Sequence, residues 1–349
     1  MTTISSLLSD GEGSRLESWW GVTGIMRRMS GPWLTLGVII AAIGVLLAIG
    51  VAAVAALMLL RPRRMTDGRA LVRLRRLSPG DLGMEFEEQN FLVLDESSGG
   101  KIGLAGWWIP NAKPTDRCAI LLHGYADAKV GAIAWAPLFQ SLGFHVLAVD
   151  LRAHGQSEGR YSTAGYFERH DVSQVIDQLR AQRPDETRRV VLFGASLGAA
   201  VAAATGAMRE DLMGVILESP FADYSHAIVH QADRIGLPGA IFQWGALRVA
   251  QWIAGCDFSE VRPVETIGRI GSPVMVISTW DDPFVPPEDL AALRGAVEGR
   301  DPGHGPSVFW EIADAHHLLG ILRDPEEYCR RIEEFLIRSA RIVPPEAGK

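Results

Sequence analysis

The sequence predicts an α/β fold in which a mostly parallel central sheet is covered by helices on both faces and is preceded by one transmembrane helix. Three observations lead to this fold class. From about residue 81 onward, short apolar runs alternate with helical patterns, as in sheets whose strands are buried on both faces. At 189–204 a strand pattern passes through a glycine-framed turn directly into a helix of small residues. Ahead of both, the 28 residues 33–60 carry no charge.

Composition narrows the class of protein. The chain has 349 residues, is 48% hydrophobic and carries a net charge of −7, so it has room for one large α/β domain or two ordinary ones. This charge gives no indication of nucleic-acid binding. Cys118, Cys256 and Cys329 are odd in number and widely spaced, which fits neither a disulfide framework nor a metal site. We expect free thiols, buried or partly buried. A homo-oligomer is neither indicated nor excluded.

The uncharged run 33–60 predicts a membrane-spanning helix. A helix needs about 20 apolar residues to cross a bilayer core, and this run exceeds that length. The alternatives are a cleaved signal peptide and a buried core helix. The run is too long and too far from Met1 for a signal sequence, and no convincing cleavage site follows it. Residues 1–32 are polar, contain glycine and serine, and are expected to be mobile.

Arginines around the span predict its orientation. After the span come Arg61, Arg63, Arg64, Arg69, Arg73, Arg75 and Arg76, and before it come Arg15, Arg27 and Arg28. Because positive residues favour the cytoplasmic side, we expect the C-terminal part in the cytoplasm. If translation begins at Met26, however, the sequence resembles a signal anchor that faces outward. The remaining chain divides into a basic juxtamembrane linker (61–80), a globular domain (81–343) and a tail (344–349).

The globular domain contains eight expected strands and five expected helices. The strands are Phe91–Leu94, Ile102–Trp108, Cys118–Leu122, Phe144–Val149, Val190–Phe193, Val215–Leu217, Val274–Ser278 and Val308–Ile312. The helices are Gly131–Leu142, Glu168–Arg180, Leu197–Met208, Pro287–Val297 and Pro325–Ile337. Residues 223–271 break the alternation, and with Phe242, Trp244, Trp252 and Ile253 they predict a small helical cap over the carboxyl edge of the sheet. Ordinary core packing is the alternative for these hydrophobic helices.

The turn Gly194-Ala195-Ser196-Leu197-Gly198 predicts a nucleophile. Glycines at both ends allow a tight, strained turn, because they bring no Cβ against the neighbouring strand and helix. The Ser196 hydroxyl is then exposed at the end of a buried strand. The alternative is an ordinary serine in a loop. Acyl transfer also needs backbone N–H groups directed at the developing oxyanion, and those of Leu197 and Tyr125 are the natural pair.

Two later strand ends offer an acid and a base. Asp281 and Asp282 follow the strand that ends at Ser278, although an aspartate before a proline-rich helix start is also a common cap. His316 and His317 follow the last strand, where two surface histidines are the alternative. Carboxyl ends of parallel strands meet at one edge of a sheet, so the three groups are expected close together. The order serine, aspartate, histidine favours a catalytic triad.

These motifs together resemble the α/β-hydrolase superfamily, in its serine aminopeptidase-like and monoacylglycerol-lipase-like branch, over about 90–338. The matching segments are His123-Gly124-Tyr125, Asp150-Leu151-Arg152-Ala153-His154-Gly155-Gln156-Ser157, Gly194–Gly198, Asp282–Pro286 and His317. The resemblance implies Asp282 as the acid and His317 as the base. His316 occupies the place of a small residue in the family, so the choice between the two histidines stays open. Ala153 stands where the family usually has glycine, in a loop that the resemblance makes structural.

The expected function is that of a membrane-anchored serine hydrolase. Ser196 attacks the substrate carbonyl, His317 accepts its proton, Asp282 orients the imidazole, and the N–H groups of Tyr125 and Leu197 hold the oxyanion. No metal or organic cofactor is required. Carboxylic esters of lipid-like or small acyl groups are the expected substrates, and no nucleic acid is expected as a partner. The alternatives are an aminopeptidase-like, thioesterase or acyl-transferring enzyme of the same fold, and a non-catalytic membrane scaffold.

Overall fold

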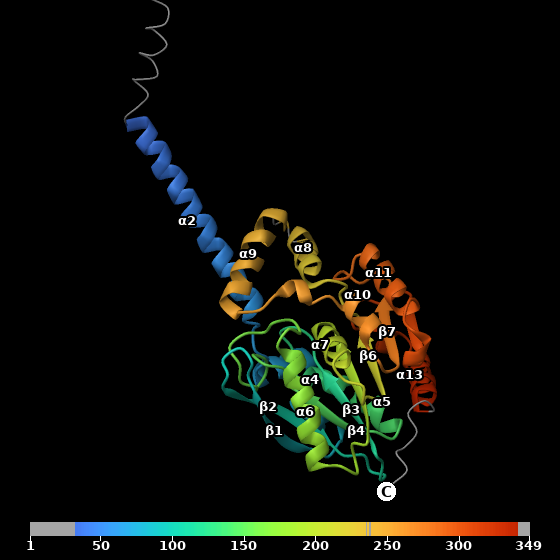
Figure 1. Cartoon of the computed structure of the whole chain (residues 1–349). Helices are drawn as coiled ribbons and strands as arrows, with labels where there is room; N and C mark the ends of the chain where they lie inside the picture. Colours follow the sequence, from blue (N-terminus) through green and yellow to red (C-terminus); the bar gives the residue numbers. More distant parts are fainter. Residues whose placement is uncertain (1–31, 235, 237–238, 341–349) are drawn as a thin grey trace, which may run out of the picture. The chain divides into compact units, whose positions relative to one another are not determined.

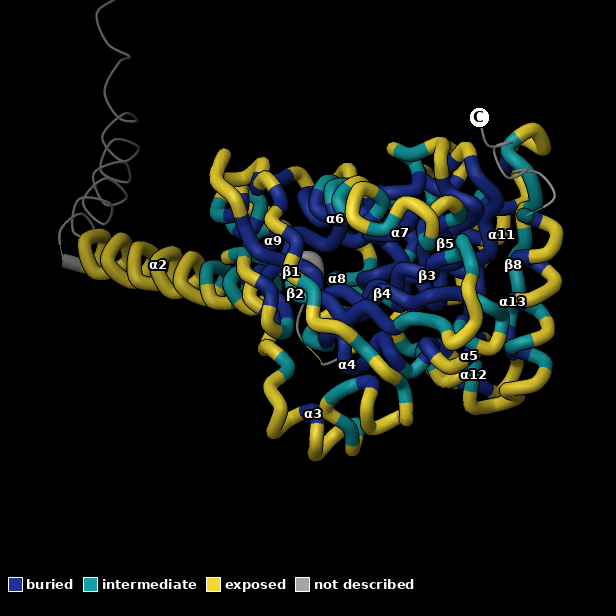
Figure 2. The backbone as a smooth tube through the Cα atoms, turned by 90° about the horizontal axis from the view of Figure 1, so that it is seen from below, coloured by how far each residue is buried: buried dark blue, intermediate teal, exposed yellow. Residues whose placement is uncertain are grey.

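The computed structural model describes residues 32–234, 236 and 239–340 (Figure 1). The chain divides into two units after Ala52. The tail 344–349 and nearly all of the segment 1–32, expected to be mobile, lie outside the described residues. Helix α2 (Pro32–Leu60) contains one apolar stretch long enough to cross a membrane, Trp33–Leu60, with a mean hydropathy of 2.9. Its residues are exposed from 33 to 51 and become partly buried toward Leu60, as the change from yellow to teal in Figure 2 shows.

The second unit, 53–349, is built on an eight-stranded, mostly parallel sheet, which is the predicted fold class. The spatial order is β1-β2-β4-β3-β5-β6-β7-β8. β1 and β2 pair antiparallel, β2 pairs antiparallel with β4, and the other pairs are parallel. The strands are β1 (Glu87–Leu94), β2 (Lys101–Ile109), β3 (Arg117–Leu122), β4 (His145–Val149), β5 (Arg189–Ala195), β6 (Gly214–Glu218), β7 (Val274–Thr279) and β8 (Ser307–Ile312).

The central strands are apolar except at their ends, because both faces of the sheet are covered. Along β5, Val190 and Leu192 enter one hydrophobic cluster, and Val191 and Phe193 enter the other. Side chains alternate across a strand, so a strand buried on both faces reads as an unbroken apolar run. Figure 2 shows this central layer in dark blue. The register aligns Leu122 with Gly194, and Ala195 with Glu218, so these strand ends meet at one edge.

Helices cover both faces as expected. Side chains of α6, α7 and α11 pack in the first hydrophobic cluster, and side chains of α5 and α13 pack in the second. Their bounds are α4 (Lys129–Ala132), α5 (Ala136–Ser141), α6 (Glu168–Gln182), α7 (Leu197–Gly206), α11 (Pro287–Glu298), α12 (Gly320–Arg323) and α13 (Pro325–Ala340). The single helix expected at 131–142 is instead α4, a 3-10 turn and α5. Pro137 lies in the first turn of α5, and its missing N–H breaks the helical ladder there.

The segment expected as a cap contains α8 (Tyr224–Arg234), α9 (Gly239–Ala254) and the short α10 (Pro263–Thr266), inserted between β6 and β7. Within it Trp252 is exposed, and the side chains of Phe242 and Trp244 lie outside the described part. Residues 61–80 hold the helix α3 (Asp67–Leu74), whose start is capped by the Thr66 hydroxyl.

Candidate active site

The turn after β5 has the strained geometry that the glycine pattern predicts. Ser196 has φ 55° and ψ −113°, a conformation that side-chain-bearing residues rarely adopt. A Cβ on Gly194 would lie 2.1 Å from the carbonyl oxygen of Gly198, and a Cβ on Gly198 would lie 2.3 Å from that of Leu122. Both approaches involve backbone atoms, so only glycine fits. The turn is held from the next strand, where the Glu218 carbonyl accepts the N–H of Ser196 at 2.8 Å.

Two backbone N–H groups next to Ser196 have no acceptor among the described residues: those of Tyr125 and Leu197. Leu197 is the first residue of α7, where the helix dipole favours negative charge. Gly124 brings the loop after β3 close to the serine, since a Cβ there would lie 3.4 Å from the Cβ of Ser196. The structure therefore leaves free donors at the two positions expected for the oxyanion.

The loop after β3 is braced by His123. Its Nε2 accepts the N–H of Leu151 at 3.0 Å, so the ring proton lies on Nδ1 and is donated to the carbonyl of Gly124 at 2.7 Å. Burial lowers the pKa of His123, which favours this neutral form. His123 thus fixes the backbone that carries the Tyr125 N–H.

Two neighbouring His–Asp pairs differ sharply in their surroundings. His317 Nδ1 lies 2.7 Å from Asp282 Oδ2, and the Asp282 side chain is only 2% exposed. Asp282 also accepts the N–H of Phe284 at 2.9 Å. His316 Nδ1 lies 3.1 Å from Asp281 Oδ2, but these side chains are 67% and 71% exposed. The structure therefore brings Asp282 and His317 together, and it is His317 that lines the same cavity as Ser196.

That cavity has a volume of about 520 Å³, within the usual range for small-molecule sites. The helical segment between β6 and β7 contributes Tyr224 and Ile228, and the loop after β7 contributes Phe284. Leu59, from the last turn of α2, also lines it. Most of the lining is apolar, so the site suits an acyl chain better than a charged group.

Sequence reasoning missed a buried carboxyl at the end of β6. Glu218 accepts a hydrogen bond from the Tyr328 hydroxyl. That hydroxyl in turn accepts a hydrogen bond from the indole N–H of Trp135 at 3.1 Å. Burial, with a smaller contribution from the nearby Asp282 carboxylate, raises the pKa of Glu218 to about 8, so it is mostly neutral at pH 7. The available signal was a glutamate directly after the apolar run Val215–Leu217.

The loop 150–157, expected to be structural, is held by buried ion pairs. Arg152 binds Asp171 (2.5 Å) and Asp95 (3.0 Å), while Lys129 binds Asp150 (3.0 Å). These pairs fix the loop from helices α4 and α6 and from the end of β1, which agrees with a role in supporting the fold.

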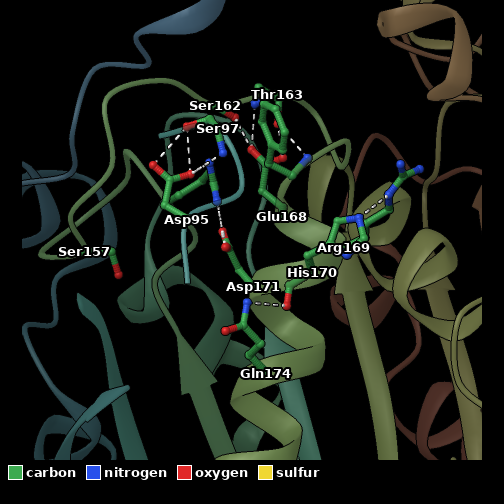
Figure 3. Close-up of polar contacts among 12 residues, drawn as sticks. Asp95, Ser97, Ser157, Ser162, Thr163, Glu168, Arg169, His170, Asp171 and Gln174 are labelled. Atoms are coloured by element: carbon green, nitrogen blue, oxygen red, sulfur yellow. Dashed lines mark hydrogen bonds and ion pairs between the residues drawn. The ribbon is translucent and has the colours of Figure 1, made fainter. Parts of the chain in front are cut away.

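The same region contains another buried acidic side chain, Glu168, and a strained alanine. Figure 3 shows Glu168 directed at Ser162 and Thr163, which donate hydrogen bonds to it. Ala153 has φ 61°, a left-handed conformation that glycine adopts most easily. This explains why related proteins usually have glycine at this position.

No group of three or more His, Cys, Asp or Glu side chains within the described residues is placed to hold a metal ion. Cys118, Cys256 and Cys329 are free thiols, the first two buried and the third partly buried.

Comparison with known proteins gives a family match and several relatives. The model of the family "Serine aminopeptidase, S33" matches residues 113–256. The uncharacterised protein YqkD of Bacillus subtilis is 25% identical over 64% of this chain and 72% of its own length. The lysophosphatidylserine lipase ABHD12 of Macaca fascicularis is 31% identical over 51% of this chain, which spans only 45% of that lipase.

Solved structures show the same fold. A Pyrococcus furiosus esterase superposes with a TM-score of 0.63 at 24% identity, over 80% of this chain and 99% of the esterase. Proteins similar to this chain therefore include some that are named as esterases and lipases. The chain therefore has the α/β-hydrolase fold, and its residues 113–256 match the serine aminopeptidase S33 family.

Proposed function

We propose that this protein is a membrane-anchored serine hydrolase that cleaves carboxylic esters of lipid-like or small acyl substrates. One observation carries the proposal: Ser196 and His317 line a single, mostly apolar cavity, and His317 is hydrogen-bonded to the buried Asp282. A non-catalytic scaffold has no need of a strained serine beside such a pair, because strain of this kind is kept where function uses it.

In the proposed mechanism, His317 accepts the proton of Ser196 as the serine oxygen attacks the ester carbonyl. Asp282 holds the imidazole in the required tautomer and stabilises its charged form. The N–H groups of Tyr125 and Leu197 donate to the oxyanion, and the N-terminus of α7 adds a favourable dipole. The alcohol leaves with the proton from His317. Water, deprotonated by the same histidine, then hydrolyses the acyl-enzyme.

The exposed apolar part of α2 supports the membrane anchor. Residues 33–51 are exposed without exception, and roughly 20 such residues suffice to cross a bilayer core. A soluble fold does not usually expose an apolar surface of this extent. By the positive-inside rule, the arginines after residue 60 favour a catalytic domain on the cytoplasmic side. Protease protection of sealed vesicles reports the side directly.

Fluorophosphonate labelling and p-nitrophenyl ester turnover of the full chain in detergent test the proposal, with Ser196→Ala as the variant. Wild type is expected to be labelled and active, and Ser196→Ala to lose both. The matched control is Ser219→Ala, which removes the other serine hydroxyl in the described lining of the cavity and should keep the labelling. Labelling that persists in Ser196→Ala would refute the assignment of Ser196 as the nucleophile.

A peptidase is the second candidate, because the matching family model describes serine aminopeptidases. Asp127 lines the cavity, and although burial raises its pKa to about 6, it is still mostly ionised at pH 7 and offers one carboxylate for a substrate amino group. A panel of short peptide amides assayed beside the esters distinguishes the two activities.

A further inference from the structure

Helix α2 is longer than a membrane anchor requires, and its last residues, 53–60, are part of the second unit. The exposed residues 33–51 already approach the roughly 20 that a bilayer core needs. Residues 53–60 fall within the second unit, where Ala56 and Leu60 are completely buried in its hydrophobic core. The last two turns of the helix are therefore part of the folded domain.

The end of α2 is held through its carbonyl groups. The last carbonyls of any helix lack intrahelical donors and need partners. Here the Tyr125 hydroxyl donates to the carbonyls of Met58 (2.5 Å) and Leu59 (3.2 Å), and the N–H of Ser162 donates to that of Leu60 (2.8 Å). The Ser162 loop is itself tied to Glu168, as Figure 3 shows.

These contacts connect the helix end to the reaction site. Tyr125 supplies, from its backbone, one of the two free N–H groups beside Ser196, while its hydroxyl binds the helix. The Leu59 side chain lines the cavity together with Ser196 and His317. Met58, one residue earlier, is 69% exposed, is not among the described lining residues of the cavity, and accepts the Tyr125 hydroxyl through its carbonyl.

We propose that the last turn of α2 is a wall of the acyl-binding cavity, with Leu59 as a specificity-determining residue and the Tyr125 hydroxyl as a positioning group for the oxyanion loop. This inference rests on the proposed function and specifies its substrate class as acyl esters of amphiphiles held at the membrane interface. Arg61 and Arg63 follow Leu59 closely, and arginines of this kind mark the polar boundary of a span. An acyl chain leaving the bilayer beside Leu59 therefore has a short apolar path to Ser196.

Leu59→Trp, with Met58→Trp as the matched control, tests the wall in the full chain in micelles. Labelling rates are measured with two fluorophosphonates, one carrying an ethyl group and one a dodecyl group. Leu59→Trp should slow dodecyl labelling by about tenfold, the effect of removing roughly two methylenes from apolar contact, and should change ethyl labelling less than about twofold. Met58→Trp should retain the wild-type ratio of the two rates.

Tyr125→Phe tests the positioning group, because it keeps the backbone N–H and removes only the hydroxyl. We expect kcat per titrated active site to fall several-fold for esters of every chain length, with KM unchanged. Tyr166→Phe, a partly buried tyrosine outside the cavity lining, should leave kcat unchanged. An equal effect of both tyrosine variants, or a rise in KM alone, would contradict the positioning role.

The outcomes separate the two proposals. If labelling depends on Ser196 but the ratio of dodecyl to ethyl labelling rates is the same in wild type and Leu59→Trp, the proposal that α2 forms a wall of the acyl-binding cavity is refuted. The hydrolase assignment is then unaffected. If the wild-type protein is not labelled, or is labelled no more than Ser196→Ala, both the hydrolase assignment and this inference are refuted.

Discussion

Replacing Asp282 with Asn keeps the shape of the side chain and removes the charge that faces His317 Nδ1. The hydrogen bond spans 2.7 Å, and the Asp282 side chain is 2% exposed, so solvent does little to replace it. A hydrogen bond to a charged group contributes about 1.5–3 kcal/mol, and the upper value corresponds to about 10²-fold in rate. The amide can also donate to the ring and hold the wrong tautomer, an effect that reaches about 10⁴-fold in serine proteases.

We therefore expect Asp282→Asn to lower kcat for p-nitrophenyl esters between about 10²- and 10⁴-fold, measured per folded molecule. Asp281→Asn is the matched control, since it changes the same residue type one position earlier in an exposed pair worth at most about 1 kcal/mol. It should keep nearly full activity. His316→Ala and His317→Ala repeat the comparison on the base. Equal losses from the two aspartates, or a loss below about threefold for Asp282→Asn, would refute the assignment of the acid.

Two further predictions concern buried charge. Glu218 has a folded-state pKa of about 8 against an ordinary value of 4.5, so folding disfavours its ionisation and stability falls as pH rises from 4.5 to 8. Glu218→Gln should therefore raise Tm by at least about 2 °C at pH 8.5 and leave it nearly unchanged at pH 5; scanning calorimetry that finds the same Tm difference at both pH values would contradict this. Arg152→Met leaves the buried Asp171 without its ion-pair partner and should reduce the free energy of unfolding by about 3 kcal/mol in urea titrations. Adding Asp171→Leu should restore part of this loss. A loss under about 1 kcal/mol would show that the pair is dispensable.

Much of the fold was predictable because its causes are local. Apolar runs identified the eight strands, and those in the centre of the sheet are nearly unbroken because a strand buried on both faces needs no polar alternation. The helix expected at 131–142 was the exception among the long segments. Its residues are apolar and helical in pattern, but Pro137 withholds an N–H and the segment breaks into shorter pieces.

The candidate site was predictable in its order and not in its detail. Gly194 and Gly198 indicated a tight turn because close backbone approach leaves room for no other residue. His316 and His317 are adjacent and chemically identical, so only packing distinguishes them. Glu218 could be placed at a strand end from the sequence, but its neutral state depends on burial beside Tyr328, which lies 110 positions away.

By itself, the sequence determined the alternating strands and helices, the strained serine turn, the order of the proposed nucleophile, acid and base, and the uncharged helix ahead of them. Each of these depends on residues close together in the chain. Only the tertiary structure decided which histidine meets Asp282, and that the end of α2 lines the cavity. Tyr125 reaches Met58 across 67 residues of sequence. Contacts at that separation arise from how the whole chain packs, and no local pattern of residues encodes them.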